Sequence, residues 1–225
     1  MQPTRLADDT YAAIVAMIED EGMRVGHRLP AETQLAETIG VSRSVVREAL
    51  ARLASDGVTE SRRGAGSFVV RLPSQLLKRH VDGASLSGTL GTYEVRFVLE
   101  AEAARLAAIR RSGPQVEVIV HRLDELRRAL RSSQPADGED MELHRAIMAA
   151  TGNGSFVEAF NALEPDIGRV MKAGVDISRS RPSHVIDAMI DEHEHIVEAI
   201  RHSDPERAAL AMRWHLSQGR RRLMP

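Results

Sequence analysis

The sequence of 225 residues predicts a mainly α-helical protein, in which an N-terminal winged helix-turn-helix precedes a C-terminal all-α helical bundle. Two observations lead to this fold class. First, two short apolar helical patterns meet at a glycine-serine turn, and two short strand patterns follow them. Second, from Thr92 onward the apolar patterns have a helical period, and polar loops or prolines separate them. Aromatic residues make up only 3% of the chain, which suits helices packed along aliphatic faces.

The helix-turn-helix pattern lies between Leu29 and Arg52. Gly40 can adopt the left-handed conformation that ends the first helix, and Ser42 is a suitable N-cap for the second. The second helix begins with four polar or basic residues, Ser42, Arg43, Ser44 and Arg47. In this motif such residues contact base edges and phosphates in the major groove. The pattern therefore predicts a DNA-binding helix, against the alternative of a surface helix with two solvated arginines.

A β-hairpin is predicted directly after this helix. Val58–Ser61 and Ser67–Val70 have strand composition, and a basic, glycine-rich turn at Arg62–Gly66 joins them. The hairpin would form the wing, and a helix from Asp9 or Thr10 to about Glu21 would complete the domain. The net charge is −2, but the second helix and wing hold six arginines against three acidic residues, so the positive charge is local.

The segment LPAETQLAETIGVSRSVVREALARLASDGVTESRRGAGSFVV resembles the winged helix-turn-helix of GntR-family transcription regulators. The resemblance spans about residues 10–71. It implies that the DNA contacts fall on Ser42, Arg43, Ser44, Arg47, Arg63 and Gly64. Thr33 departs from the family pattern, because many members carry a DNA-contacting arginine at this place after the LPxE motif. We therefore expect Thr33 at the DNA interface, with one family contact missing and the operator preference altered.

The chain divides by pattern into a DNA-binding domain at 1–71, a linker at 72–91 and a helical domain at 92–225. Six bundle helices are predicted, at 93–111, 115–131, 139–151, 155–173, 182–202 and 205–223. The first two carry apolar patterns that include Val95, Val98 and Val118. There is no cysteine, no signal-peptide pattern and no apolar run near the length of about 20 residues that a membrane span needs. We expect a soluble cytoplasmic protein that contacts no membrane.

Four residues of the helical domain form a candidate metal-ligand set. Asp140 and His144 are four residues apart and share one helix face, while His193 and His215 lie on the last two helices. An aspartate with three histidines is a plausible ligand set for Zn²⁺ or another divalent first-row ion. The alternative is a solvated surface pair. Apolar residues flank all four positions, and this favours the buried metal site because unpaired polar groups there would be costly.

Residues of about 91–221 resemble the FCD ligand-binding domain of the FadR-like branch of the same family, through YEVRFVLEAEAARLAA, HRAIMAATGN and the pattern that begins at His193. Many members bind a metal with this aspartate and three histidines. The resemblance implies that Asp140, His144, His193 and His215 bind a divalent metal, most often Zn, with Ni or Mn as alternatives. His195 should point to another side of its helix. The remaining histidines are read as unrelated to the site: His27, His80, His121, His184 and His202.

The resemblance also implies an effector site. Arg96 would face a cavity and pair with the carboxylate of a small effector, and Asn153 would lie near the same cavity. A hydroxy-, keto- or sugar-acid could chelate the metal while Arg96 binds its other end. The alternative for Arg96 is a helical salt bridge with Glu100, four residues further on.

These observations predict a metabolite-responsive transcription regulator, expected to act as a repressor. It would bind a pseudo-palindromic double-stranded operator as a homodimer, since paired recognition helices read half-sites about one DNA turn apart. One alternative is a metal-dependent hydrolase or lyase, which would need a general base among Glu142, Glu192 and Glu194. The other is a regulator whose metal is only structural.

Overall fold

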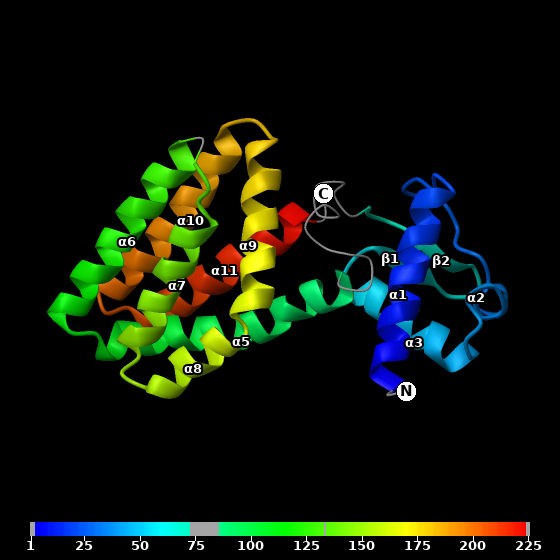
Figure 1. Cartoon of the computed structure of the whole chain (residues 1–225), viewed down its shortest axis with the longest axis horizontal. Coiled ribbons are helices and arrows are strands. Elements are labelled where there is room, and N and C mark those ends of the chain that lie inside the picture. Colours follow the sequence, from blue (N-terminus) through cyan, green and yellow to red (C-terminus); the bar gives the residue numbers. More distant parts are fainter. Residues whose placement is uncertain (1–2, 73–85, 133, 224–225) are drawn as a thin grey trace. The chain divides into compact units, whose positions relative to one another are not determined.

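The computed structural model describes residues 3–72, 86–132 and 134–223. Contacts within the chain divide it into two compact units: the second comprises Thr92–Arg222, and the first comprises the residues before it together with Leu223 (Figure 1). The linker predicted at 72–91 lies largely outside the described residues. Its end, from Leu86 onward, already belongs to a helix.

The first unit is a small three-helix domain with a hairpin. Its elements are α1 (Pro3–Asp20), α2 (Glu32–Ile39), α3 (Arg43–Ser55), β1 (Thr59–Arg62) and β2 (Gly66–Val69). Both α1 and α2 pack on α3. The core between them includes the fully buried residues Tyr11, Ile14, Ile18, Leu35, Val46 and Leu53.

The turn between α2 and α3 has the predicted geometry. Gly40 has φ 77°, in the left-handed region that favours glycine. The Ser42 side chain caps α3 by accepting a hydrogen bond from the Val45 N–H. These two local features fix where α3 begins, and thus which side chains its first turn presents.

The wing is a twisted antiparallel hairpin. Thr59 lies opposite Val69, and Arg62 lies opposite Gly66. A segment before α2 adds a short third piece, in which the Leu29 N–H donates to the Ser67 carbonyl at 2.8 Å. At the tip, Gly64 has φ 74°, which only glycine adopts easily. The wing is therefore anchored to its own domain at the base, while its basic tip projects beyond the paired strands.

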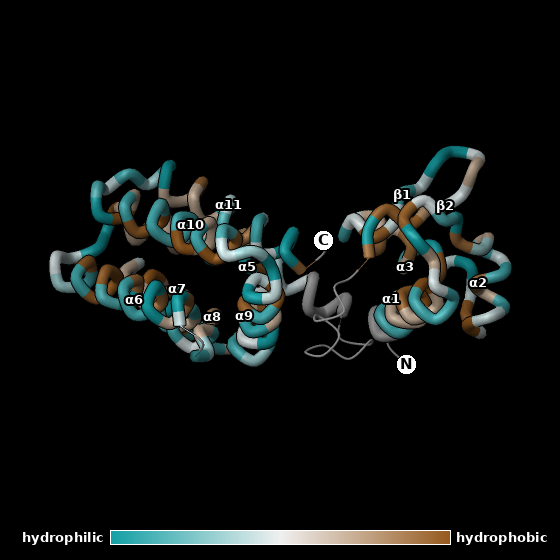
Figure 2. Tube along the Cα trace, turned by 90° about the horizontal axis from the view of Figure 1, so that it is seen from above, coloured by the Kyte–Doolittle hydropathy of each residue, from teal (hydrophilic) through white to brown (hydrophobic). Residues whose placement is uncertain are grey.

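The second unit is an all-α bundle. Its elements are α5 (Leu86–Arg110), α6 (Gly113–Arg131), α7 (Asp137–Ala150), α8 (Gly154–Ala162), α9 (Glu164–Arg179), α10 (His184–Arg201) and α11 (Pro205–Leu223). The central helix, α7, packs against α6, α8 and α9, and α10 packs against α6 and α9. Colouring by hydropathy shows the apolar residues of α6, α7 and α10 on the sides that face one another (Figure 2). Among the described helices, none has both the length and the apolar character needed to cross a membrane.

Three predicted helices have wrong bounds. The helix expected to start at Asp9 or Thr10 is α1, which begins at Pro3. The helix expected at 155–173 is two helices, α8 and α9, which meet at Leu163, and α9 continues to Arg179. Pro165 lies in the first turn of α9, where its missing N–H costs nothing, and it cannot continue α8. The helix expected to start at Tyr93 begins at Leu86.

The predicted apolar pattern of α5 is wrong at Val95 and Val98, whereas Ala103 is buried and Leu99 packs against the core. Val95 and Val98 are 46% and 75% exposed, whereas Arg96 and Glu100 are buried. Similarly, Val118 on α6 is 49% exposed. The first half of α5 thus turns two charged residues toward the bundle interior and two valines outward.

Candidate functional site

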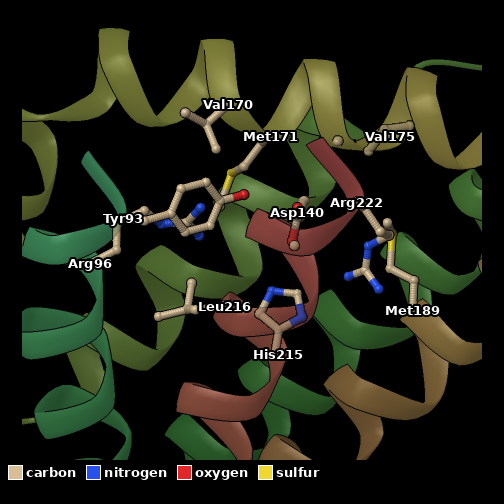
Figure 3. A pocket seen from close by; sticks show the side chains of 12 residues that line it. Tyr93, Arg96, Asp140, Val170, Met171, Val175, Met189, His215, Leu216 and Arg222 are labelled. Carbon is tan, nitrogen blue, oxygen red and sulfur yellow. The ribbon is translucent and has the colours of Figure 1, made fainter. Parts of the chain in front are cut away.

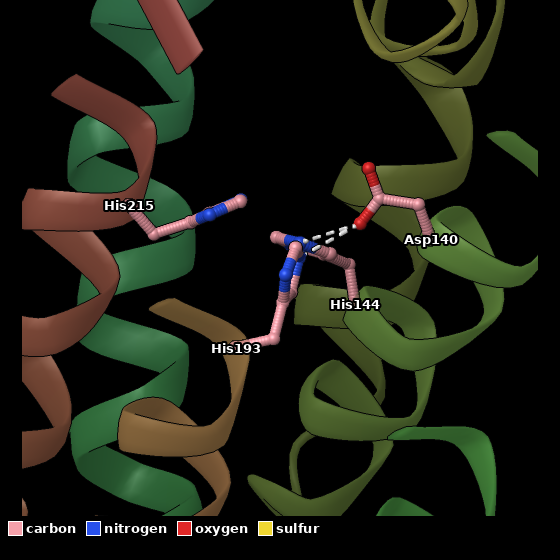
Figure 4. Close-up of side chains that lie close together, drawn as sticks. All are labelled: Asp140, His144, His193 and His215. Atoms are coloured by element: carbon pink, nitrogen blue, oxygen red, sulfur yellow. Dashed lines mark hydrogen bonds and ion pairs between the residues drawn. The ribbon is translucent and has the colours of Figure 1, made fainter. Parts of the chain in front are cut away.

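The four residues predicted as metal ligands form one buried cluster in the second unit (Figure 4). Asp140 and His144 come from α7, His193 from α10 and His215 from α11. A nitrogen or oxygen atom from each lies within 4.8 Å of those of the other three. The His193 Nε2 is 3.0 Å from the Asp140 Oδ1, and the His144 Nε2 is 3.4 Å from the same oxygen. His195, two residues after His193, is exposed, as predicted.

Each histidine of the cluster has an oxygen partner on its outer nitrogen, Nδ1. These partners are Glu100 for His144, the Met189 carbonyl at 2.8 Å for His193, and Glu192 at 3.1 Å for His215. An oxygen partner that accepts the Nδ1 proton fixes the orientation of a neutral ring and puts its lone pair on Nε2, which in His144 and His193 lies near Asp140. Histidines that bind metal ions have this arrangement of outer partners.

The cluster fits a divalent metal. The His144 Nε2 is buried and has no hydrogen-bond partner, which in a polar interior costs about 1–3 kcal/mol. Zn²⁺ binds nitrogen and oxygen ligands at about 2.0–2.1 Å in a tetrahedron, so adjacent ligand atoms lie about 3.3 Å apart. The distances of 3.0 and 3.4 Å from Asp140 to two of the histidines are close to that spacing. A cation at the centre would satisfy the unpartnered nitrogen and join all four residues.

Two buried ion pairs surround the cluster. The pair of Arg96 and Glu100 was predicted as the alternative for Arg96, whereas the pair of Arg222 and Glu192 was not predicted. Arg96 pairs with Glu100, and Arg222 pairs with Glu192 through two bonds of 2.7 Å each. Burial alone would raise the pKa of Glu192, but Arg222 and His215 outweigh burial and lower the pKa to about 2. Burial would likewise raise the pKa of Glu100, but the nearby Arg96 outweighs this effect and is the main reason that the pKa is lowered to about 2. Both carboxyl groups are therefore charged at neutral pH.

The histidines respond differently to these charges. Burial disfavours a charged His144, but Glu100 and Asp140 outweigh it and raise the pKa of His144 to about 9. Burial and the nearby His193 lower the pKa of His215 to about 3. Neutral histidines, the form that binds metals, would leave three buried carboxylates against two guanidinium groups. A divalent cation would turn this excess of one negative charge into an excess of one positive charge.

A small cavity of about 30 Å³ adjoins the cluster (Figure 3). Its polar lining includes Tyr93, Arg96, Asp140, His215 and Arg222, and its apolar lining includes Val170 and Met171. The volume is enough for about one or two water molecules. Burial raises the pKa of Tyr93 to about 12, so its hydroxyl is a hydrogen-bond donor at neutral pH. Arg96 thus lines the cavity, as the family resemblance implies, and also forms the alternative salt bridge with Glu100.

Asn153 is not among the described residues that line this cavity. Its exposed side chain caps α8, where the Asn153 Oδ1 accepts a hydrogen bond from the Ser155 N–H at 3.1 Å. Asn153 thus caps α8, and its expected contact with an effector stays a prediction. The other histidines outside the cluster are exposed where they are described, at His27, His121, His184 and His202, whereas His80 lies outside the described residues.

The predicted DNA-contacting residues are exposed in the first unit. They lie at the start of α2, at the start of α3 and at the wing tip: Thr33, Ser42, Arg43, Ser44, Arg47, Arg63 and Gly64. A feature that the sequence did not reveal is Glu32, which pairs with Arg47 at 2.8 Å and lies 3.9 Å from Arg43. The hydrogen bond from Arg47 is the main cause of a lowered pKa at Glu32. Glu32 therefore holds the two recognition-helix arginines together on one exposed face.

Comparison with known families identifies the class of protein. Residues 6–69 match the family described as bacterial regulatory proteins of the gntR family. Residues 92–218 match the FCD domain. The chain is a DNA-binding transcription regulator, and it belongs to the GntR family with an FCD domain.

Similar proteins cover nearly the whole chain. One from Escherichia coli K12, described as a regulatory protein of the L-lactate dehydrogenase operon, is 31% identical over 229 residues, which are 96% of this chain and 85% of that one. The Uxu operon transcriptional regulator of the same organism is 31% identical over 238 residues, which are 100% of this chain and 90% of that one. The solved structure of Streptococcus agalactiae GntR is 25% identical in sequence and has a TM-score of 0.50. The match covers 96% of this chain and 99% of that one. These relatives and both families are regulators, so the chain is not the hydrolase or lyase considered above.

Proposed function

We propose that this protein is a repressor whose FCD domain binds one divalent metal and a small carboxylate effector, and that the effector changes its affinity for operator DNA. The observation that supports the metal most directly is the buried cluster of Asp140 and three histidines, whose ligand atoms lie within 4.8 Å of one another and in which the His144 Nε2 makes no hydrogen bond. The donor set of three nitrogens and one carboxylate favours Zn²⁺, with Ni²⁺ or Mn²⁺ as alternatives.

Charge supports an anionic effector. A divalent ion among the neutral histidines would leave one uncompensated positive charge in a buried site, and one carboxylate would neutralise it. When bound, the metal supplies open coordination positions that suit the carboxylate and hydroxyl or keto oxygens of a hydroxy-, keto- or sugar-acid. Arg96 would hold the far end of such an acid, and the Tyr93 hydroxyl would donate a hydrogen bond to it. A relative described as a regulator of an L-lactate dehydrogenase operon is consistent with a hydroxy-acid.

Operator binding would require two copies of the chain. We propose a DNA-binding domain at 1–71, a linker at 72–91 and an effector domain at 92–225, with two recognition helices reading a pseudo-palindromic site. The contacts would come from Ser42, Arg43, Ser44, Arg47, Arg63, Gly64 and Thr33. The protein would release DNA on binding the effector only if the effector bound more tightly to the form of the dimer that does not fit the operator.

The test is an operator-binding titration. Fluorescence anisotropy would measure binding of the metal-loaded protein to an inverted repeat from the region upstream of its own gene, with L-lactate, pyruvate or a sugar acid added in turn. We expect one acid to weaken binding at least tenfold, while its uncharged amide has no effect. If no acid changed the affinity of a protein that bound the operator tightly, the effector part of the proposal would be wrong.

A second candidate function keeps the metal purely structural. The small volume of the cavity, about 30 Å³, favours this alternative, since any effector larger than a few atoms requires side chains to move. In that case, removal of the metal would lower stability, and no acid would bind in its presence. Calorimetric titration of the metal-loaded protein with the same acids separates the two functions.

A further inference from the structure

Glu32 is an acidic residue that lies among the predicted DNA contacts. It is the first residue of α2 and directly precedes Thr33, and its side chain is 34% exposed. A carboxylate on a surface that meets DNA repels the phosphate groups, so it lowers the affinity for every DNA sequence. Its presence at this place calls for a function that outweighs the repulsion.

The Glu32 carboxylate binds one edge of the Arg47 guanidinium group. The Arg47 Nη2 donates to the Glu32 Oε2 at 2.8 Å, and the Arg47 Nε donates to the Glu32 Oε1 at 3.4 Å. The Arg43 Nη2, from the previous turn of α3, lies 3.9 Å from the same Oε2. An arginine has five N–H donors, and this pair uses one on Nε and one on Nη2. The second N–H of Nη2 and both N–H groups of Nη1 remain outside the pair.

The remaining donors of Arg47 match a guanine base. In the major groove, guanine presents O6 and N7 as two adjacent acceptors, which the two N–H groups at the end of an arginine bind together. Arg47 can therefore bind Glu32 and a guanine at the same time. The Arg47 side chain is 66% exposed, so the carboxylate restricts its rotamers before DNA arrives and less entropy is lost on binding.

Glu32 also lowers the positive charge at the start of α3. The hydrogen bond from Arg47 is the main reason that the pKa of Glu32 is lowered, so its carboxyl group is charged at neutral pH. One negative charge beside Arg43 and Arg47 leaves a net charge of +1 in place of +2. The attraction to phosphates falls with that charge, whereas the two hydrogen bonds to guanine depend on the N–H donors.

We propose that Glu32 determines the sequence specificity of this regulator, because it orients Arg47 toward a guanine of the operator and weakens binding to other DNA. This rests on the DNA contact of Arg47 in the proposed function and assigns the residue that prepares that contact. Glu32 is a positioning residue, since it acts through Arg47. A surface salt bridge that only joined α2 to α3 would change stability by a small amount and leave base recognition unaltered.

A matched control lies on the same helix as Arg47. Glu48 pairs with Arg52 at 2.5 Å, and Arg52 also pairs with Asp8 of α1 at 2.5 Å. This ion pair therefore lies on the side of α3 that faces α1. Glu48→Gln removes the same charge and one ion pair as Glu32→Gln does, but it leaves the pairing of Arg47 as it is.

The test measures binding of full-length wild type, E32Q and E48Q to two DNA duplexes by fluorescence anisotropy, without effector. One duplex carries the inverted repeat from upstream of the gene, and the other carries a scrambled sequence of equal composition. We expect E32Q to bind the scrambled duplex more tightly, and the ratio of the two affinities to fall by about tenfold. On the scrambled duplex, the slope of log K against log salt should become steeper by about 0.9, the value for one more neutralised phosphate. E48Q should keep the wild-type ratio and slope.

Substituted bases test the orientation of Arg47. 7-Deazaguanine lacks N7, so replacing the guanines of each half-site in turn should weaken wild-type binding by about tenfold at one position. In E32Q this loss should shrink to less than about threefold. Glu32→Asp keeps the charge but withdraws it from Arg47, so it should keep the wild-type salt slope and lose the guanine effect. E32D also replaces E32Q in the test if circular dichroism shows that E32Q does not fold.

An E32Q protein with the affinity ratio and salt slope of wild type, or an E48Q protein that changes equally, would overturn this proposal. Arg47→Ala separates its failure from a failure of the proposed function. If R47A bound the inverted repeat as tightly as wild type does, the DNA contact of Arg47 would itself be wrong. If R47A lost affinity while E32Q kept the wild-type ratio and slope, only the role of Glu32 would be rejected.

Discussion

Removal of one ligand from the histidine cluster should abolish the stabilisation that the metal gives. The chain offers a matched pair of variants for this purpose, His193→Ala and His195→Ala, two residues apart on α10. His193 is 1% exposed and lies 3.0 Å from Asp140, whereas His195 is exposed and outside the cluster. Any general effect of losing an imidazole on this helix should appear in both variants, and only His193→Ala should lose the response to metal.

The size of the effect follows from linkage. A metal at one hundred times its dissociation constant stabilises the folded state by about 2.7 kcal/mol. For a domain the size of Thr92–Arg222, each kcal/mol moves Tm by about 4 °C, so the metal should raise Tm by about 10 °C. The assay is differential scanning fluorimetry of each protein with a chelator and with excess Zn²⁺.

We expect a metal-dependent shift of about 10 °C in wild type and H195A, and less than about 2 °C in H193A. The comparison of each variant with itself removes the cost of the cavity that His193→Ala leaves. An equal shift in H193A and wild type would show that the ion binds elsewhere, and the assignment of the four ligands would have to be abandoned.

Three further predictions concern the surroundings of the two sites. Glu192→Gln should weaken metal binding by about 10–100-fold, because Glu192 orients His215. Competition with a chromophoric chelator measures this affinity, and the control Glu194→Gln, on the same helix, should leave it unchanged. Arg96→Met should lower the free energy of unfolding in urea by about 3 kcal/mol, because it leaves Glu100 buried without its ion pair; a change as small as that of the surface variant Arg105→Met would contradict this. Arg47→Ala should weaken operator binding at least tenfold by anisotropy and reduce discrimination against a scrambled site, and an unchanged affinity would place the DNA contacts elsewhere.

The sequence predicted the DNA-binding unit well because its signals are local. The left-handed Gly40 and the Ser42 cap are features of single residues and their immediate neighbours, and both appear in the structure as expected. The wing follows from two short strands around a turn with Gly64 at φ 74°. Propensity and capping act over a few residues, so they can be read from the chain without knowledge of its tertiary contacts.

In the bundle, local patterns failed where tertiary partners decide. Val95 and Val98 fit an apolar helical pattern, but α5 buries Arg96 and Glu100 instead, because Glu100 meets His144 from α7. Such a pairing, between residues 44 positions apart, leaves no signal in the helical period of α5. The break at Leu163 was missed for a different reason, since an apolar pattern continues across it.

The candidate site was predicted only in part. The four cluster residues came from their spacing together with the family resemblance, while Glu192 and Arg222 were not expected to support them. Glu192 directly precedes His193, which could have drawn attention to it, but its role depends on His215 and Arg222 from α11. An ion pair between side chains of two helices can be identified only when the packing of those helices is known.

Native mass spectrometry of the purified protein, combined with elemental analysis, tests the central claim most directly. The proposed function predicts one divalent ion, most often zinc, for each chain of a dimer, and loss of that ion in His193→Ala but not in His195→Ala. A small carboxylic acid bound with the ion would also name the effector by its mass. A dimer that takes up no divalent ion, even after incubation with Zn²⁺, Ni²⁺ and Mn²⁺, would contradict the claim and leave Asp140, His144, His193 and His215 as a buried polar cluster.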